Sequence, residues 1–277
     1  MSKKPLVSVI VPTKNASAFL DRCLNSIARQ TYKKIEIIVV DNHSKDRTKA
    51  IARSYASHIF TKGPERCSQL NYGASKAKGK YIYRVDQDFF VQPNVIKECV
   101  DKCEIEGFDC VAVHNTSDPT VSFWAKVRKF ERDMYKGDSL IVGCRFWSRK
   151  AFFAVDGFDE RMIACEDYDI HNRMLEKGFR IGRIQSEEVH LGEPRTLAEI
   201  CKKSYEYGRS MRRIILNNRL KKQINPYRKV FLRNMDNFVY HPILAIGFLI
   251  MNIIKLLAFN SGRLKGDIAC EKTYSFY

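Results

Sequence analysis

The stretch Tyr81-Ile82-Tyr83-Arg84-Val85-Asp86-Gln87-Asp88-Phe89-Phe90 decides how the whole chain is interpreted. Its β-branched and aromatic residues predict a strand that runs directly into two carboxylates, Asp86 and Asp88. Ionised carboxylates resist burial unless their charge is compensated, and a divalent cation held between protein and substrate phosphates would compensate it. Asp-x-Asp is also common in turns, so the segment alone leaves a turn and a metal site open.

The rest of the N-terminal two thirds alternates between strand and helix patterns. Predicted strands cover 7–11, 35–40, 58–60, 81–90, 110–114, 139–147, 181–184 and 188–191. Predicted helices start at Asn15 or Ser17 as the cap, at about Asp46, at Cys67 with Gly79 as the stop, at Pro93, at Arg149 and at Cys165. This order is typical of βαβ units. It predicts an α/β fold class with a Rossmann-like, mostly parallel open sheet and helices on both faces.

Polar residues follow three of these predicted strands. They are Pro12-Thr13, Asp41-Asn42 and the Asp86 to Asp88 segment. Ligands of open α/β sheets bind beyond the carboxyl ends of the strands, so these residues meet in one crevice if the strands are neighbours. The chain has no G-x-G-x-x-G after the first strand and no GxxxxGK[ST], which argues against a dinucleotide site and a P-loop.

Several later residues are candidates for the same crevice. Glu166 and Asp167 open a predicted helix, where Asp167 is either a catalytic base or an N-cap. His190 is either a metal ligand or an imidazole hydrogen-bonded at a strand end. Trp147 stacks on a sugar or fills the core, and Arg145 pairs with acceptor phosphates or lies in solvent.

Taken together, the motifs resemble the family 2 glycosyltransferases with the GT-A fold. The matching segments are Val9 to Asn15, Ile37 to Asn42 with Ser44-Lys45-Asp46, Asn71 to Ala74 with Lys78 to Ile82, Val85 to Asp88, Gly157 to Glu160, and Glu166-Asp167. They occur in the family's order over roughly residues 6 to 192. Each motif is weak alone, but the ordered set is specific.

The resemblance implies a role for each matching position. Pro12 and Asp41 are similar to positions that hold the nucleotide base, with Thr13 and Asn42 beside them. Asp86 corresponds to a position near the ribose and diphosphate, Asp88 to the metal-binding carboxylate, and Asp167 to the catalytic base. Glu166, Trp147 and Arg145 fall on the acceptor side. Asn42 departs from the pattern, since many members carry a second Asp there, and this leaves the identity of the base open.

The implied chemistry is transfer of a sugar from a UDP- or GDP-sugar donor. Asp88 would hold Mn²⁺ or Mg²⁺ on the leaving diphosphate, and His190, as a possible further ligand, favours Mn²⁺. Asp167 would take the proton of the acceptor hydroxyl, and its place at a helix start predicts a lowered pKa. A single displacement inverts the anomeric configuration.

The charge and the C-terminal part suggest a membrane. The formal net charge is +17, and the segment from Arg195 to Arg233 holds twelve Lys and Arg against two Glu. An amphipathic helix over 197–216 is followed, after Asn225-Pro226, by an apolar stretch over 238–259 that Pro242, Gly247 and Asn252 interrupt. We expect a catalytic domain over 1–220 and a basic, apolar helical segment over 221–277.

This segment is expected to lie in a membrane interface, be re-entrant or pack on a partner subunit, with a single span and a buried core helix as alternatives. The expected location is the cytoplasmic face of the cell membrane, with a lipid-linked acceptor (a polyprenyl phosphate or diphosphate) or a glycan acceptor. The helix could also make a homo-oligomer.

Composition narrows the alternatives. The nine cysteines form no CxxC pair, which predicts reduced thiols, a cytosolic setting and no zinc site. The apolar run from Leu6 to Val11 is too short for a signal peptide, so none is expected. A sugar-phosphate nucleotidyltransferase could use the same metal segment, and its product would be pyrophosphate. A basic nucleic-acid- or membrane-binding protein without catalysis is a third reading. Nucleic acid is not expected as a partner, since the basic segment lacks interleaved aromatic residues.

Overall fold

The computed structural model describes residues 4–138, 142–162, 165–210 and 229–274. The chain divides into two compact units, which are described separately. The sheet unit comprises Met1–Thr116, Ser139–Arg161 and Glu166–Gly192, and the helical unit comprises Ser117–Asp138, Met162–Cys165 and Glu193–Tyr277. The boundary at residue 220 expected from the sequence lies outside the described residues and stays a prediction.

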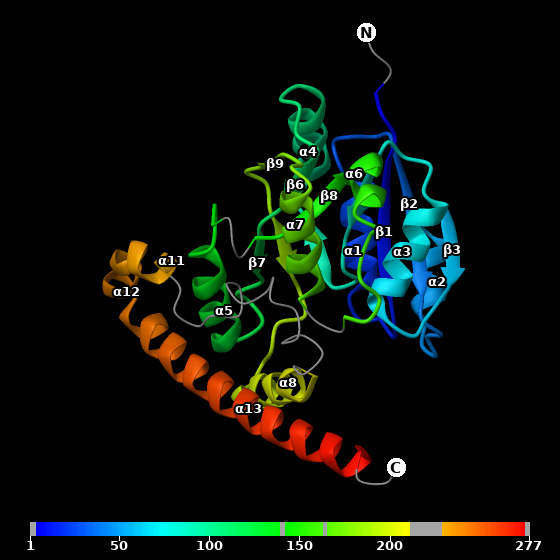
Figure 1. Cartoon of the computed structure of the whole chain (residues 1–277). Coiled ribbons are helices and arrows are strands. Elements are labelled where there is room, and N and C mark those ends of the chain that lie inside the picture. Colours follow the sequence, from blue (N-terminus) through cyan, green and yellow to red (C-terminus); the bar gives the residue numbers. More distant parts are fainter. Residues whose placement is uncertain (1–3, 139–141, 163–164, 211–228, 275–277) are drawn as a thin grey trace. The chain divides into compact units, whose positions relative to one another are not determined.

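A seven-stranded sheet forms the centre of the sheet unit (Figure 1). Its strands, in the order β3-β2-β1-β4-β8-β6-β9, are β1 (Val7–Thr13), β2 (Ile35–Asp41), β3 (His58–Thr61), β4 (Tyr81–Arg84), β8 (Cys144–Ser148), β6 (Cys110–Ala112) and β9 (Ile181–Arg183). The first four in this order are parallel to one another, and β8 is antiparallel to both of its neighbours. The mostly parallel open sheet predicted from the sequence is therefore confirmed.

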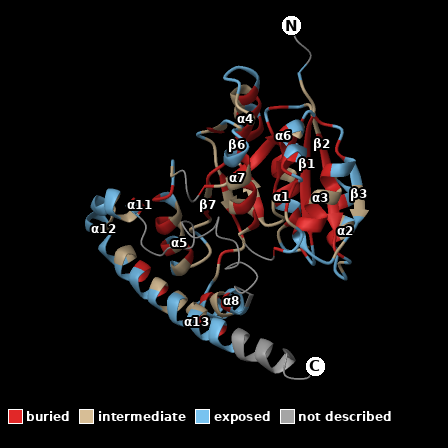
Figure 2. Ribbon diagram, in the orientation of Figure 1, coloured by how far each residue is buried: buried red, intermediate tan, exposed pale blue. Residues whose placement is uncertain are grey.

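Helices cover both faces of this sheet. They are α1 (Leu20–Ala28), α2 (Thr48–Arg53), α3 (Arg66–Lys76), α4 (Val95–Glu104), α6 (Arg149–Ala154) and α7 (Glu166–Glu176). Side chains alternate across β1, so that Val9 and Val11 join the core under α1, α2 and α4, whereas Ile10 joins the core under α3, α6 and α7. Figure 2 shows the buried residues concentrated on the strands and on the inner sides of these helices. Burial on both faces explains why these strands are continuously apolar.

The stretch that opened the sequence analysis forms two strands rather than one. β4 ends at Arg84, the Asp86 to Asp88 segment turns, and β5 (Phe89–Val91) begins a second, three-stranded sheet with β10 (Glu188–His190) and β7 (Asn115–Ser117). β5 and β10 are antiparallel, with His190 opposite Phe89. The two carboxylates therefore lie on the connection between two sheets.

The start of α1 differs from the prediction. Neither Asn15 nor Ser17 caps it, since the helix begins at Leu20 and no side chain accepts a hydrogen bond at its N-cap, Phe19. The Asn15 side-chain oxygen instead accepts from the Lys45 amide at 3.0 Å, and the Ser17 amide donates to Asp46 at 3.0 Å. These polar residues therefore tie the loops after β1 and β2 together.

The ends of one predicted strand and one predicted helix also differ from the prediction. β1 continues through Pro12, because its pairing with β4 has already ended at Ile10 and no partner there needs the missing N–H. α3 ends at Lys76, before Gly79. Gly79 is needed for close approach, since a Cβ there would lie 2.7 Å from the Ser8 backbone nitrogen and 2.8 Å from the Leu6 carbonyl oxygen.

The helical unit contains the only long apolar helix among the described residues. Its elements are α5 (Phe123–Asp133), α8 (Leu197–Ser210), α11 (Lys229–Arg233), α12 (Met235–Tyr240) and α13 (Pro242–Tyr274). No prediction was made for α5. A small core joins α5, α8 and α13, and its buried members are Val127, Phe130, Met134, Ile200, Phe248 and Met251.

The C-terminal segments follow the sequence only in part. The amphipathic helix predicted over 197–216 is described as α8, where Ile200 and Gly208 are buried and Cys201 is exposed. Residues 211–216 of that prediction and Asn225-Pro226 lie outside the described residues. α13 starts at Pro242 and runs unbroken through Gly247 and Asn252. Its portion Pro242–Lys265 is, by length and composition alone, able to cross a membrane.

Candidate active site

The polar residues after β1, β2 and β4 meet at one edge of the sheet. These strands are adjacent, and their carboxyl ends point the same way. The Asn42 amide donates to the Thr13 carbonyl at 2.7 Å, which joins the ends of β2 and β1. The Lys14 amide donates to the Gln87 side chain at 2.8 Å, which joins the end of β1 to the Asp-x-Asp turn. The meeting of these strand ends expected from the sequence is therefore observed in the sheet unit, and a ligand crevice there stays a prediction.

Asp41 is the last residue of β2 and is buried at this edge of the sheet. Its carboxylate is 0% exposed and accepts from the Thr13 hydroxyl at 3.1 Å and from the Ser44 amide at 3.0 Å, with the Lys49 ammonium 3.5 Å away. Asn42 is also buried, and its side-chain amide donates to the Pro64 carbonyl. In this arrangement Asp41 holds Thr13 and Ser44 in place, and contact of its carboxylate with a nucleotide base stays a prediction.

Asp86 is enclosed by two buried arginines. Arg84 donates to both of its oxygens, each at 3.1 Å, and Arg145 donates to Oδ2 at 3.0 Å. Burial alone would raise the pKa of Asp86, but the two guanidinium groups, Arg84 before Arg145, outweigh it and hold that pKa well below its usual range. Asp86 is therefore a permanently ionised carboxylate that fixes the turn.

Arg145 also reaches a second buried carboxylate, Glu188. Its Nε lies 2.8 Å from Glu188 Oε2, and the Tyr83 hydroxyl donates to Glu188 Oε1 at 2.5 Å. Arg145 was expected at the acceptor entrance. The structure instead places it inside the protein, between Asp86 and Glu188, where it joins β8 to the Asp86 to Asp88 segment and to β10.

We expect removal of Arg145 to destabilise the fold strongly. Arg145→Met leaves Asp86 and Glu188 buried with less compensation, which costs about 3–5 kcal/mol of unfolding free energy. Urea denaturation measures this change in unfolding free energy. Arg161→Met removes an arginine that is 89% exposed and should change the value by less than about 0.5 kcal/mol. Equal small effects of both substitutions would show that the buried pairing is not needed.

Glu166 connects the Asp-x-Asp turn to α7. Arg84 donates to Glu166 Oε1 at 3.0 Å, and Arg66 donates to the same oxygen. Burial would raise the pKa of Glu166, yet Arg66 and Arg84 lower it. Glu166 was expected on the acceptor side. It is buried and ion-paired, so it anchors the first turn of α7 beside Arg84 and Asp86.

Asp167 is the next residue along α7. Its Oδ1 accepts from the Tyr168 amide at 3.0 Å, which is consistent with the expected role at a helix start. The predicted lowering of its pKa is wrong, because burial and then the neighbouring Glu166 carboxylate raise it, despite Arg84, Arg145 and Arg66. A carboxylate with a raised pKa binds a proton more tightly than the helix start alone predicts, and the role of Asp167 as the catalytic base stays a prediction.

Asp88 and His190 form the pair that could hold a metal ion. His190 Nε2 lies 3.2 Å from Asp88 Oδ2, and the Leu191 amide donates to the Asp88 carbonyl at 2.8 Å. Gly192 leaves the space open, since a Cβ there would lie 3.0 Å from Asp88 Oδ2. Asp88 keeps 28% of its side chain exposed. One carboxylate and one imidazole suit Mn²⁺, and the open side leaves room for further oxygen ligands.

No larger metal-ligand set accompanies this pair. Within the described part of the chain, no group of three or more His, Cys, Asp and Glu is placed to hold a metal ion. A cation on Asp88 and His190 would therefore need most of its ligands from a bound diphosphate and water, which is the way Mg²⁺ and Mn²⁺ sites on phosphates are commonly completed.

Trp147 does not belong to the site. It is 0% exposed, and its ring packs edge-on against Phe152 and Phe158, with centroids 5.5 and 5.7 Å away. Of the two alternatives for Trp147, the structure therefore shows the core position, with the indole packed under α6.

Sequence reasoning missed several residues that shape the site. Arg84 could have been found, since a cation inside an otherwise apolar strand must have anionic partners. Glu188 and Tyr83 lie in predicted strands but carry no motif. Arg66 and Glu166 are 100 positions apart, and nothing in the local pattern predicts their contact.

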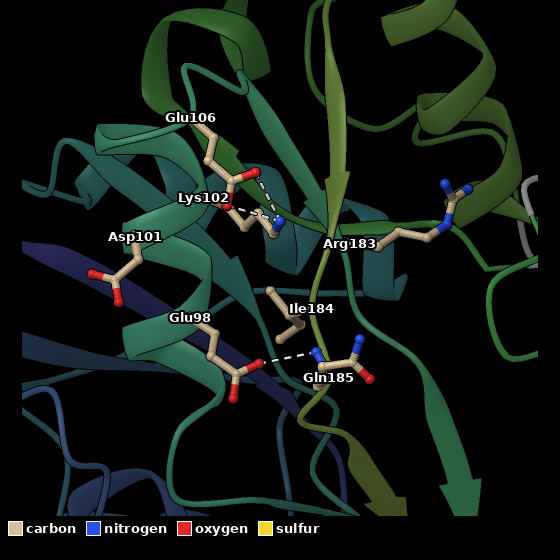
Figure 3. Close-up of a pocket in the computed structure, with 7 residues that line it drawn as sticks. All are labelled: Glu98, Asp101, Lys102, Glu106, Arg183, Ile184 and Gln185. Atoms are coloured by element: carbon tan, nitrogen blue, oxygen red, sulfur yellow. Dashed lines mark hydrogen bonds and ion pairs between the residues drawn. The ribbon is translucent and has the colours of Figure 1, made fainter.

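A separate cleft of about 270 Å³ lies between α4 and the end of β9. Figure 3 shows its lining, which is mostly charged: Glu98, Asp101, Lys102, Glu106, Arg183, Ile184 and Gln185. Lys102 pairs with Glu106 at 2.8 Å, and Glu98 accepts from the Gln185 amide at 2.9 Å. None of these residues is among the polar residues that meet after β1, β2 and β4. The candidate site is therefore at that edge of the sheet and not in this cleft.

Solved structures with the same architecture define the class of fold. A mannosyltransferase from Pyrobaculum calidifontis, in complex with GDP-Man and Mn²⁺, superposes with a TM-score of 0.59 at 18% identity and covers 100% of this chain and 82% of its own. Glucosyl-3-phosphoglycerate synthase from Mycobacterium tuberculosis, in complex with Mn²⁺ and UDP, has a TM-score of 0.53 at 17% identity, over 76% of this chain and 80% of its own. The fold is GT-A, as expected.

Sequence comparison identifies the family. The model of glycosyl transferase family 2 matches residues 8–160. The chain therefore belongs to glycosyl transferase family 2. An uncharacterized glycosyltransferase of Rickettsia bellii is 30% identical over 218 residues, which are 70% of this chain and 30% of that protein. Chondroitin synthase of Escherichia coli is 26% identical over 189 residues, 64% of this chain and 28% of that protein.

The chain spans only part of the length of such relatives. It covers 30% of the Rickettsia bellii protein and 59% of a second uncharacterized glycosyltransferase, from Rickettsia typhi. Membership of the family thus rests on the sheet unit, which contains residues 8–160 except 117–138.

Proposed function

We propose that the protein is an inverting glycosyltransferase that moves a sugar from a nucleoside diphosphate sugar to a hydroxyl or phosphate acceptor. One observation carries the proposal. The Asp88–His190 pair, the Asp86 turn and the start of α7 with Asp167 meet at one sheet edge, joined by Arg84, which contacts both Asp86 and Glu166. A donor-phosphate site and an acceptor base are the two parts that sugar transfer needs.

Asp88 and His190 would hold a divalent cation, Mn²⁺ or Mg²⁺. The donor set supports this, and so do the two GT-A structures, both of which carry Mn²⁺. When bound, the cation supplies a Lewis acid that stabilises the charge on the leaving diphosphate. Thr13 and Asn42 line the neighbouring strand ends, where the resemblance places the nucleotide, and UDP and GDP both remain candidate donor nucleotides.

Asp167 would act on the acceptor. Its carboxylate takes the hydroxyl proton while the acceptor oxygen forms a bond to the anomeric carbon and the bond from that carbon to the phosphate oxygen breaks. The single displacement inverts the configuration. Arg84, Arg66 and Glu166 hold the first turn of α7 in position, so that Asp167 and the Asp-x-Asp turn keep a fixed relation.

We further propose a lipid-linked acceptor, a polyprenyl phosphate or diphosphate, at the cytoplasmic face of the membrane. Twelve Lys and Arg against two Glu over 195–233, followed by the apolar Pro242–Lys265 portion of α13, support this location. A basic segment next to an apolar helix provides two independent attachment signals.

The released product tests the proposed reaction. With Mn²⁺ and nucleotide sugars, we expect free nucleoside diphosphate in an amount equal to the sugar transferred or hydrolysed, measured by ion-exchange chromatography. Pyrophosphate formed from a sugar phosphate and a nucleoside triphosphate would instead identify a nucleotidyltransferase and overturn the proposal.

A further inference from the structure

The outer face of α13 is apolar without interruption over four turns. Between Ile243 and Phe259 every exposed side chain is Ile or Leu: Ile243, Ile246, Leu249, Ile250, Ile253, Leu256 and Leu257. Their exposed fractions run from 41% to 70%. At 3.6 residues per turn they fall within an arc of about 140°. We call these seven residues the outer stripe, and Figure 2 shows α13 exposed along one side.

The opposite face of α13 is held by other helices of the same unit. A Cβ on Gly247 would lie 2.7 Å from Val127 of α5, so the two helices touch there. Lys255 pairs with Glu131 of α5 at 2.8 Å. Further along, Gly208 of α8 lies against the Phe259 carbonyl, and Gly262 lies against the Tyr205 carbonyl. α13 therefore has one protein-covered face and one apolar outer face along the same length.

This arrangement is incompatible with α13 crossing a bilayer. α8 lies along α13, and its exposed side chains include Glu199, Lys202, Lys203, Glu206 and Arg209. A span would carry these charges into hydrocarbon, where each is costly. The outer stripe is also only about 21 Å long, from 1.5 Å per residue, against a hydrocarbon core of about 30 Å.

The charge of this part of the chain indicates whether a lipid surface or a second copy of the chain covers the outer stripe. From Arg195 to Lys265 the sequence holds fifteen Lys and Arg against three Asp and Glu. The described part includes exposed Arg263 and Lys265, beyond the stripe on α13, and exposed Lys229 and Arg233 on α11. Two copies of a chain with this net charge repel each other, whereas anionic headgroups attract the charge and accept the apolar side chains of the outer stripe.

We infer that α13 lies flat on an anionic bilayer, with the outer stripe in the headgroup–acyl boundary and its other face on α5 and α8. The inference goes beyond the proposed function, because it names the contacting surface and excludes a span, and it holds for any sugar and acceptor. It also determines how the helical unit is oriented on the lipid.

Vesicle flotation of the full chain tests the inference. The wild type should float with vesicles of phosphatidylcholine and phosphatidylglycerol, bind phosphatidylcholine alone far less, and leave cell membranes on carbonate washing. The double variant Ile246→Glu, Ile253→Glu should lose binding by at least about tenfold. The matched control Ile105→Glu, Leu175→Glu changes two apolar residues that are 78% and 52% exposed in the sheet unit and should bind like the wild type.

Three results would overturn the inference. They are absence of the wild type from the floated fraction, resistance to carbonate, and a wild-type dimer in solution that the stripe variant dissociates while flotation is unchanged. Circular dichroism of each variant confirms the fold. Donor hydrolysis by the stripe variant should remain at the wild-type rate, so failure of lipid docking is separable from failure of the proposed reaction.

Discussion

Asp88→Ala should reduce metal-dependent sugar transfer and donor hydrolysis by about 10²- to 10⁴-fold, since a cation on a leaving group contributes several kcal/mol to the transition state. Asp88 is the half-buried carboxylate of the Asp88–His190 pair and has no arginine partner among the contacts of the described residues. Its removal therefore takes away the proposed metal ligand without leaving a buried charge. Rates with and without added Mn²⁺ measure the effect.

The matched control is Asp101→Ala. Asp101 is a half-exposed carboxylate of α4 that pairs with Lys97 one helical turn away, at 2.6 Å, and such pairs contribute about 0.3–0.5 kcal/mol. We expect wild-type activity from this variant and unchanged thermal stability in both. If Asp88→Ala kept its response to Mn²⁺, the metal would have to bind elsewhere.

Asp167→Asn should leave donor binding intact and lower transfer by about 10²- to 10⁴-fold, the usual contribution of a general base. The amide keeps the shape and the hydrogen bond from the Tyr168 amide but cannot take a proton. Nucleotide affinity, measured by calorimetry, should therefore stay at the wild-type value. The transfer rate, measured separately, should fall. Loss of both together would indicate a structural role.

The pKa of Asp167 adds a pH signature to the same variant. Because burial and Glu166 raise this pKa above its ordinary value of 3.8, transfer should rise with pH through a value higher than that. The contribution of Asp167 to folding stability changes in the opposite direction and falls as pH rises. A group whose folded pKa is raised favours the folded state at low pH, and this contribution is lost as pH rises through the folded pKa. Asp167→Asn should remove that loss, so its thermal stability near neutral pH should equal or exceed the wild type.

Much of this site could be predicted because most of its residues come directly after predicted strands in the sequence. Continuous apolar runs such as Ile35–Asp41 predict buried parallel strands, and parallel strands bring their following residues to one edge. Asp41, Asp86 and Asp88 were placed in this way, and Asp167 came from the ordered motifs. One of the two alternatives for His190, a ligand of the same metal as Asp88, also predicted that these side chains lie together, although β5 was not recognised as a separate strand.

The parts that could not be predicted depend on contacts between distant segments. The direction of the Asp167 pKa shift is one example, since a helix start alone predicts a lowered value and only the fold reveals its burial beside Glu166. Arg145 is another. Its surroundings in the sequence give no sign that it would be enclosed with Asp86 and Glu188 rather than exposed to an acceptor. Such assignments require the three-dimensional neighbours.

Binding of a nucleoside diphosphate with and without Mn²⁺ tests the central claim most directly. Calorimetric titration of UDP and GDP into the wild type should show affinity for one of them that rises at least about tenfold with Mn²⁺, and Asp88→Ala should bind that nucleotide equally weakly in both conditions. The same Mn²⁺ enhancement in Asp88→Ala, or none in the wild type, would contradict the account.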